Sequence, residues 1–175
     1  NNTPKAMSTF LAALLETKSG LDLNSPKSSE FITNSNGQIL HIRSHVSLAD
    51  PSKPPTAVVI SLHGYASHGN RPPHSYIGRE FNRNNIAYIN LDFHGHGYSD
   101  GVRALVHSFV DLVDDIVSLL LALYSDITIN EEQNYSVAQN IPLTVPFFLM
   151  GHSMGGTCAI LTSNFICLLK EDGTS

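Results

Sequence analysis

Residues 151–156 of the chain read Gly-His-Ser-Met-Gly-Gly, and this stretch decides the fold. An apolar run of strand length, residues 146–150, precedes it, and residues 154–169 form a predicted helix that is apolar nearly all round. Between a strand and a helix, the pattern Gly-x-Ser-x-Gly predicts a tight turn that exposes the hydroxyl of Ser153. The start of the helix would face any oxyanion formed there. A glycine-rich turn with an idle serine is the alternative.

Strands and helices alternate along the chain before this turn. Apolar runs predict the order strand 57–62, helix 75–84, strand 86–91 and a helix that begins near Ser108. A hairpin over residues 31–43, with an Asn-Gly turn, comes first, and the polar segment 126–144 is predicted to be irregular. This order predicts an α/β fold, in which a β-hairpin joins a mainly parallel sheet with helices on both faces.

The two ends of the chain carry their own signals. Residues 1–28 are predicted to be an N-terminal helix and a linker, because Thr3 and Pro4 fit the start of a helix. A secretory signal is the alternative, but charged and polar residues stand where its cleavage site belongs. Residues 29–175 are predicted to be the N-terminal part of one α/β domain, since an apolar segment lies close to the last residue. We expect such a piece alone to aggregate or self-associate.

Composition excludes several classes of protein. Ten Lys and Arg residues against 15 Asp and Glu give a formal net charge of −5, which is unlike a nucleic-acid-binding surface. No apolar run approaches the roughly 18–20 residues of a membrane-spanning helix. Cys158 and Cys167 would point to opposite faces of one helix, so no disulfide is expected. We expect a cytoplasmic protein, or one whose N-terminal helix contacts a membrane peripherally.

The segment His63-Gly64-Tyr65 follows the first buried strand. Acyl transfer requires a second loop that places a backbone N–H opposite the one at the start of the helix. A His-Gly pair after an inner strand is the usual supplier, here through the amide of Tyr65. A plain turn at the end of a strand is the alternative.

Residues 92–101 follow the second buried strand and contain His94 and His96. Two close histidines suggest a metal site, but a glycine-rich turn is poorly preorganised and no carboxylate cluster accompanies them. The favoured interpretation is structural: Asp92 accepts backbone hydrogen bonds and orders the loop. No metal or cofactor is expected. Four further histidines are expected to be ordinary surface or half-buried residues: His41, His45, His74 and His107.

Together the three segments, in this order, resemble the α/β-hydrolase superfamily, and within it the monoacylglycerol lipase and lysophospholipase-like serine hydrolases. The resemblance covers roughly residues 37–169. It implies that Ser153 is the acyl-accepting nucleophile and that the backbone amides of Tyr65 and Met154 form the oxyanion hole. The residues that it implies to be structural near the site are His63, Gly64, Asp92, Gly95, His96, Gly97 and His152. Relatives usually have a small residue where this chain has Tyr65, which would narrow the acyl entrance.

One part of the expected site is missing. In this fold the triad runs Ser, then Asp or Glu, then His, and no histidine follows Ser153 in the chain. His152 is expected to project away from the hydroxyl, and His63 and His94 lack an evident carboxylate partner. Without a base the hydroxyl is a poor nucleophile, so we expect the chain alone to be nearly inert.

For the intact protein, the resemblance implies hydrolysis of a lipid ester, a monoacylglycerol or a lysophospholipid. Two alternatives stay open, because a fold does not fix a substrate. One is a non-catalytic binding module with a hydrolase-like fold. The other is a peptidase or thioesterase on the same fold.

Overall fold

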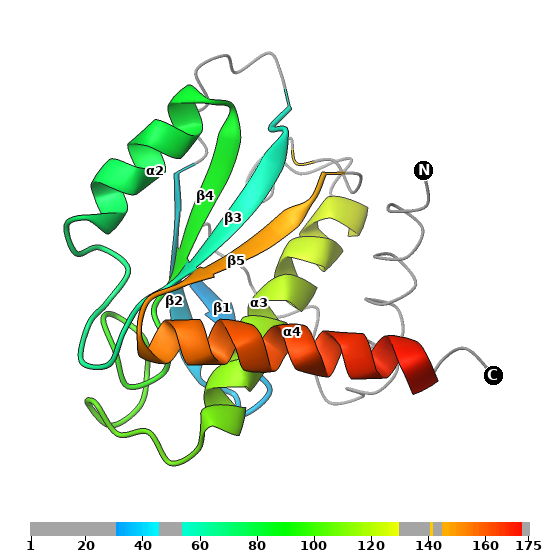
Figure 1. Cartoon of the computed structure of the whole chain (residues 1–175). Helices are drawn as coiled ribbons and strands as arrows, with labels where there is room; N and C mark the ends of the chain where they lie inside the picture. The colour runs from blue at the N-terminus through cyan, green and yellow to red at the C-terminus, as the bar shows by residue number, and fades with distance from the viewer. Residues whose placement is uncertain (1–30, 46–53, 130–140, 142–144, 173–175) are drawn as a thin grey trace.

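The computed structural model describes residues 31–45, 54–129, 141 and 145–172. Its elements are β1 (Phe31–Thr33), β2 (Ile39–His45), β3 (Ala57–Leu62), α2 (His74–Arg83), β4 (Ile86–Leu91), α3 (Phe109–Ile129), β5 (Phe147–Gly151) and α4 (Met154–Asp172) (Figure 1). The predicted hairpin and the predicted alternation of strands and helices are therefore confirmed. The helix and linker predicted for residues 1–28 lie outside the described residues, as does most of the segment 126–144.

The five described strands form one mixed sheet in the order β1-β2-β4-β3-β5. β3 is parallel to both of its neighbours, β4 and β5, whereas β2 pairs antiparallel with β4 and with β1. Leu62, the last residue of β3, lies opposite Leu91 of β4 and Gly151 of β5. The loops that follow these three strands therefore start side by side at one edge of the sheet (Figure 1).

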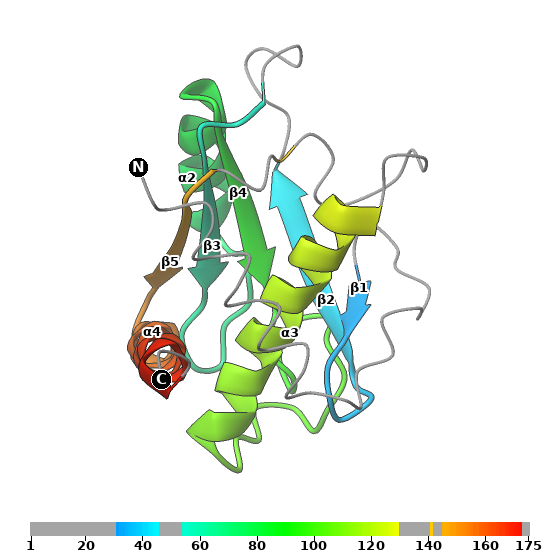
Figure 2. The same ribbon diagram turned by 90° about the vertical axis from the view of Figure 1, so that its right-hand side faces the viewer.

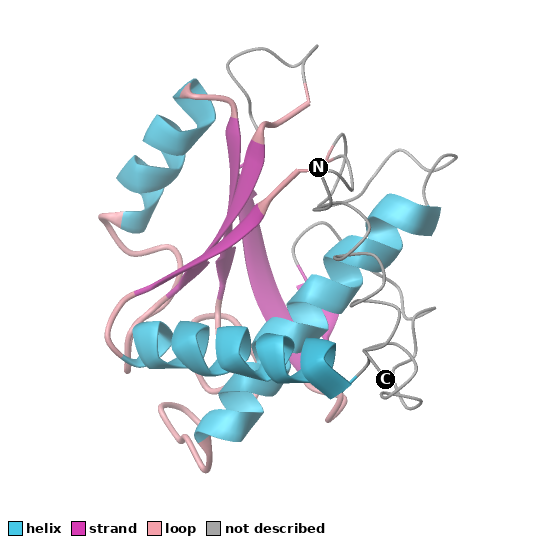
Figure 3. Ribbon diagram, turned by 45° about the vertical axis from the view of Figure 1, so that its right-hand side comes forward, coloured by secondary structure: helices cyan, strands magenta, loops and turns pink. Residues whose placement is uncertain are grey.

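Helices cover both faces of the sheet, as predicted (Figures 1 and 2). Helix α2 packs on one face against β4, and α3 and α4 lie on the other. Figure 3 shows α3 and α4 crossing each other on their side. The core lies between the sheet and these two helices and includes Leu40, Ile42, Val58, Ile60, Leu62, Ile89, Leu91, Leu112, Ile116 and Leu119. Burial of such side chains supplies most of the free energy of folding.

Two predicted elements differ from the structure. Helix α3 continues to Ile129, so the prediction that residues 126–129 are irregular was wrong. No glycine or proline interrupts α3, and its apolar face continues into the core through Leu123. The strand near 146–150, predicted to be buried, is only partly so: Phe148 is 54% exposed. β5 has one neighbour in the described sheet, whereas β3 lies between two strands and is buried throughout.

Helix α4 carries two free cysteines in different surroundings. Cys158 is completely buried, and burial raises the pKa of its thiol to about 11. Cys167, further along the helix, is exposed. Neither α4 nor any other helix in the described ranges combines the length and hydropathy that crossing a membrane requires.

Candidate active site

The turn between β5 and α4 has the geometry that the sequence predicts. Ser153 has a backbone φ of 53°, in the left-handed region that non-glycine residues rarely adopt. A Cβ atom at Gly155 would lie 2.6 Å from the carbonyl oxygen of His63 and closer still to that of Leu62. A Cβ atom at Gly151 would collide with the backbone of Gly155. Close packing of the backbone therefore requires glycine at both positions.

This backbone presents Ser153 to solvent. The residue is exposed, and none of the hydrogen bonds of the described residues involves its hydroxyl. The turn is anchored to the end of β3, since the N–H of His152 donates to the carbonyl of Leu62 at 3.0 Å. Met154 begins α4, and the first N–H groups of a helix have no partner within it. The positive end of the helix dipole therefore lies beside the free hydroxyl.

The loop after β3 lies against this turn. A Cβ atom at Gly64 would lie 3.4 Å from Cβ of Ser153 and 3.0 Å from Nδ1 of His152. A side chain at this position would crowd the imidazole of His152, which would have to shift by a few tenths of an ångström. Directly after Tyr65, Ala66 has a φ of 52°, and the N–H of Ser67 donates to the carbonyl of Gly64 at 3.2 Å, which closes a tight turn. The second predicted loop is thus brought beside Ser153.

His63 is a structural residue. It is fully buried, and its Nδ1 donates to the carbonyl of Gly64 at 2.7 Å while its Nε2 accepts from the N–H of Phe93 at 3.1 Å. These two bonds require the neutral ring. Burial is the main cause that lowers the pKa of His63 to about 4. Both ring nitrogens are occupied, so His63 is not available as a base for Ser153.

Asp92 orders the loop that follows β4, as the sequence predicts. Its buried carboxylate accepts from the N–H of Gly69 at 2.6 Å and from that of Tyr98 at 3.1 Å. It also pairs with Nδ1 of His41 at 2.8 Å. His41 was expected to be a surface or half-buried residue, and this expectation was wrong. It lies on β2 and is 6% exposed, because the antiparallel pairing of β2 with β4 brings it to the carboxylate.

His94 also has a carboxylate partner, contrary to the sequence prediction. Its Nδ1 lies 2.7 Å from Oδ2 of Asp115, a fully buried residue of α3 that also accepts the N–H of His94. This hydrogen bond raises the pKa of His94. His96 is buried beside it, with Nδ1 3.0 Å from the carbonyl oxygen of His94. In the described part of the chain, no group of three His, Cys, Asp or Glu residues could hold a metal ion.

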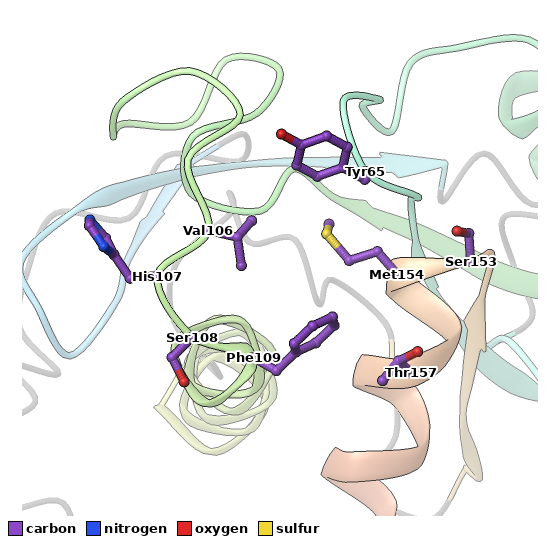
Figure 4. A pocket seen from close by; sticks show the side chains of 8 residues that line it. All are labelled: Tyr65, Val106, His107, Ser108, Phe109, Ser153, Met154 and Thr157. Atoms are coloured by element: carbon purple, nitrogen blue, oxygen red, sulfur yellow. The ribbon is translucent and has the colours of Figure 1, made fainter.

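A pocket of about 700 Å³ opens beside Ser153 (Figure 4). It is lined by Tyr65, Val106, His107, Ser108, Phe109, Ser153, Met154 and Thr157. Three residues of the predicted site, Tyr65, Ser153 and Met154, thus meet at one cavity. The other five lining residues were not among the predicted site residues. Phe109 is 43% exposed and faces the pocket, because it begins α3 at the edge of the core.

The described residues contain no base positioned on Ser153. None of the hydrogen bonds in the described ranges joins a histidine to its hydroxyl. His94 and Asp115 form a pair of the kind that orients a base, but neither residue lines the pocket. The described part therefore holds an exposed serine, a helix start and a pocket.

Known proteins are similar to this chain in both sequence and fold. Residues 53–165 match the family described as serine aminopeptidase, S33. The chain is 30% identical over 132 residues to monoglyceride lipase of Rattus norvegicus, which is 75% of this chain and 37% of that protein. It is 31% identical over 106 residues to monoacylglycerol lipase of Mycolicibacterium smegmatis, covering 61% of this chain and 32% of that one. The chain thus spans about a third of the length of these relatives.

The structure also resembles Est1E from Butyrivibrio proteoclasticus, solved with ferulic acid bound, with a TM-score of 0.58. The two share 21% sequence identity, over 79% of this chain and 48% of that one. The described elements have the fold of the N-terminal part of an α/β-hydrolase. Since the family match covers more than half of the sequence, the chain belongs to the serine aminopeptidase S33 family of α/β-hydrolases.

Proposed function

We propose that the intact protein hydrolyses carboxylic esters of lipids through an acyl-enzyme formed on Ser153. The observation that carries this proposal is the exposed hydroxyl of Ser153, held on a left-handed turn at the start of α4 and at the edge of a pocket. A hydroxyl held in this way is free to approach a carbonyl carbon. The start of the helix is then positioned for the charge that develops on the carbonyl oxygen.

The proposed reaction has two halves. Oγ of Ser153 bonds to the carbonyl carbon and gives its proton to a base, while the N–H groups of Tyr65 and Met154 donate to the oxyanion. The C–O bond to the alcohol then breaks, and the alcohol leaves with that proton. Water attacks the acyl-enzyme in the same manner, releasing the fatty acid and restoring the serine. Losing one oxyanion donor typically costs about 2.7–4 kcal/mol of transition-state stabilisation.

The base and its carboxylate partner are proposed to come from residues outside this chain. In α/β-hydrolases both follow the nucleophile, and no histidine follows Ser153 here. The 175-residue chain alone is therefore expected to be nearly inactive, because an enzyme without its base retains only the contribution of binding and the oxyanion hole. The activity belongs to the longest natural form of the protein.

The proposed substrate is a monoacylglycerol or a lysophospholipid. Two relatives at 30% and 31% identity carry the names monoglyceride lipase and monoacylglycerol lipase. The pocket beside Ser153 suits an acyl chain, since Val106, Phe109 and Met154 line it with apolar groups. A peptidase is the second candidate, because the description of the family is serine aminopeptidase.

Labelling with a fluorophosphonate tests the nucleophile, since the reagent bonds to activated serines. In the longest natural form, we expect mass spectrometry to find the label on Ser153, and the S153A variant to lose it. If the wild type takes the label, a separate unlabelled sample of it is then assayed on acylglycerols, lysophospholipids and aminoacyl esters. Absence of label would support a binding module instead. Preference for aminoacyl esters over lipid esters would favour the peptidase.

A further inference from the structure

Tyr65 combines exposure with a fixed position. Its side chain is 60% exposed, yet its hydroxyl donates a hydrogen bond to the carbonyl oxygen of Ala104 at 3.0 Å. Its ring also makes a T-shaped contact with the ring of His96, with the two centroids 6.0 Å apart. His96 is itself buried, and its Nδ1 lies 3.0 Å from the carbonyl oxygen of His94. The ring of Tyr65 is therefore held by its hydroxyl and by the contact with His96.

The acceptor of this bond belongs to a well-ordered loop. The N–H of Ala104 donates to the carbonyl of Gly95 at 2.9 Å. The neighbouring Arg103 donates from its guanidinium to the carbonyls of Gly97, at 3.0 Å, and Ser99, at 3.1 Å. Asp92 binds the same loop through the N–H of Tyr98. These bonds fix the carbonyl of Ala104 in place. If a ligand pushes the ring of Tyr65 aside, the loop of Ala104 cannot move with it, and the hydrogen bond from the Tyr65 hydroxyl breaks.

The ring forms one wall of the pocket beside Ser153. Figure 4 shows it extending from its own loop toward the loop of Val106, above the side chain of Met154. Phe109 bounds the same space from the start of α3. An ester group that extends from a carbonyl at Ser153 into the pocket would pass between Tyr65 and the apolar side chains of Met154 and Phe109. The width of this passage depends on where the tyrosine ring stands.

We propose that the side chain of Tyr65 determines substrate specificity by forming a fixed wall that admits slender unbranched aliphatic groups and excludes branched or aromatic ones. The proposal rests on the proposed ester hydrolysis and concerns the shape of the group that it accepts. A bulky group could enter only by displacing the ring, and displacement breaks the hydrogen bond to Ala104. The backbone N–H of Tyr65, which is proposed to donate to the oxyanion, can be kept while the side chain is changed, since every substitution except proline retains it.

The test compares substrate ratios in the longest natural form of the protein. Each variant is assayed with p-nitrophenyl butyrate, which is straight, and with p-nitrophenyl pivalate and benzoate, which are bulky. A second series varies the alcohol in the same way. For each variant, kcat/KM for a bulky ester is divided by kcat/KM for the straight ester. The intrinsic reactivities of the two esters are the same for every variant, so they cancel when the variants are compared. Thermal unfolding followed by circular dichroism verifies that each variant folds.

Y65A removes both the ring and its bond, and we expect it to raise the bulky-to-straight ratio about tenfold or more in at least one series. Y65F keeps the ring and loses only the hydrogen bond, so we expect a smaller rise, of a few fold. The matched control is Y76A, since Tyr76 is a similarly exposed tyrosine on α2 that does not line the pocket. Its ratio is expected to equal that of the wild type.

An unchanged ratio in Y65A, in both series, would overturn the proposal, as would an equal rise in Y76A. Failure of the proposed function gives a different result, since Ser153 of the wild type would then take no fluorophosphonate label. Hydrogen exchange tests the bond without any need for catalysis. We expect amides of residues 102–106 to exchange faster in Y65F than in the wild type, and equal rates would contradict a fixed wall.

Discussion

One glycine-rich turn follows β4 and another follows β5, at the same edge of the sheet, and the two turns use their polar groups in opposite ways. The turn after β4 buries the carboxylate of Asp92, which is occupied by the N–H groups of Gly69 and Tyr98 and by His41. The turn after β5 exposes Ser153, whose hydroxyl has no hydrogen bond among the described residues. Both backbones are tightly packed, but only the second leaves its polar side chain without a hydrogen-bond partner among the described residues.

The difference distinguishes polar groups that stabilise the fold from polar groups that are available to a ligand. A polar group whose bonds are all made inside the protein stabilises the surrounding loops and has nothing left for a ligand. A polar group held on a left-handed backbone without partners is positioned for an external molecule. The four substitutions below test this division, beginning with the one expected to change stability most.

Removing the carboxylate of Asp92 should have the largest effect. D92A leaves His41 and the N–H groups of Gly69 and Tyr98 without their acceptor in a buried site. We expect the free energy of unfolding, measured with urea, to fall by about 3–5 kcal/mol. The control is D100A, on the same loop, whose exposed carboxylate accepts the N–H of Ile39. An equal loss in both variants would remove the distinction between the turns.

Acidification should weaken the link that His63 makes between the loop after β3 and the turn after β4. Burial lowers the pKa of His63 to about 4, whereas its ordinary value is 6.5. The unfolded chain therefore binds the proton more readily, so the stabilisation is complete above pH 6.5 and is lost as the pH falls to 4. The loss amounts to about 3 kcal/mol.

The pH effect is isolated by comparison with the H63Q variant. The difference in unfolding free energy between wild type and H63Q should narrow by about 3 kcal/mol from pH 7 to pH 4. His94 contributes with the opposite sign, because its pKa is raised by Asp115. Its stabilisation is complete below pH 6.5 and is lost as the pH rises, and it cancels in the comparison. A difference that is independent of pH would show that His63 is not held neutral.

G155A should destabilise the turn after β5. The new Cβ atom would lie 2.6 Å from the carbonyl oxygen of His63, and backbone must move to accommodate it. We expect a loss of about 2–3 kcal/mol in the urea unfolding free energy. Gly156 supplies the matched control, since a Cβ atom there would come no closer than 3.3 Å to its nearest neighbour, the carbonyl oxygen of Gly151. If G156A costs as much as G155A, close packing under the turn is not the reason for the glycine.

The smallest effect is a gain in stability. Ser153 adopts a φ of 53°, a conformation that costs an L-residue roughly 1–2 kcal/mol. S153G should therefore be more stable than S153A by about 1 kcal/mol, although neither variant can take a fluorophosphonate label at this position. Urea unfolding of the two variants measures the difference. Equal stabilities would mean that the serine is held without backbone strain.

The sequence predicted what depends on nearby residues. The buried runs of β3 and β4 and the tight turn at Ser153 follow from local sequence patterns, and the structure confirms them. The pairs His41–Asp92 and His94–Asp115 were missed, because residues 51 and 21 positions apart meet only once the sheet and α3 are assembled. The hydrogen bond from Tyr65 to Ala104 joins residues 39 positions apart and was not predicted for the same reason.

Helix α4 starts directly after Ser153 and carries two thiols that a chemical reagent can distinguish. In native protein a maleimide should modify Cys167 rapidly, because that residue is exposed. Cys158 is buried and its thiolate is scarce, with a pKa of about 11, so it should react only in molecules whose α4 has separated from the sheet. Counting modified thiols over time therefore reports how often the segment behind Ser153 opens, with no added dye or engineered probe.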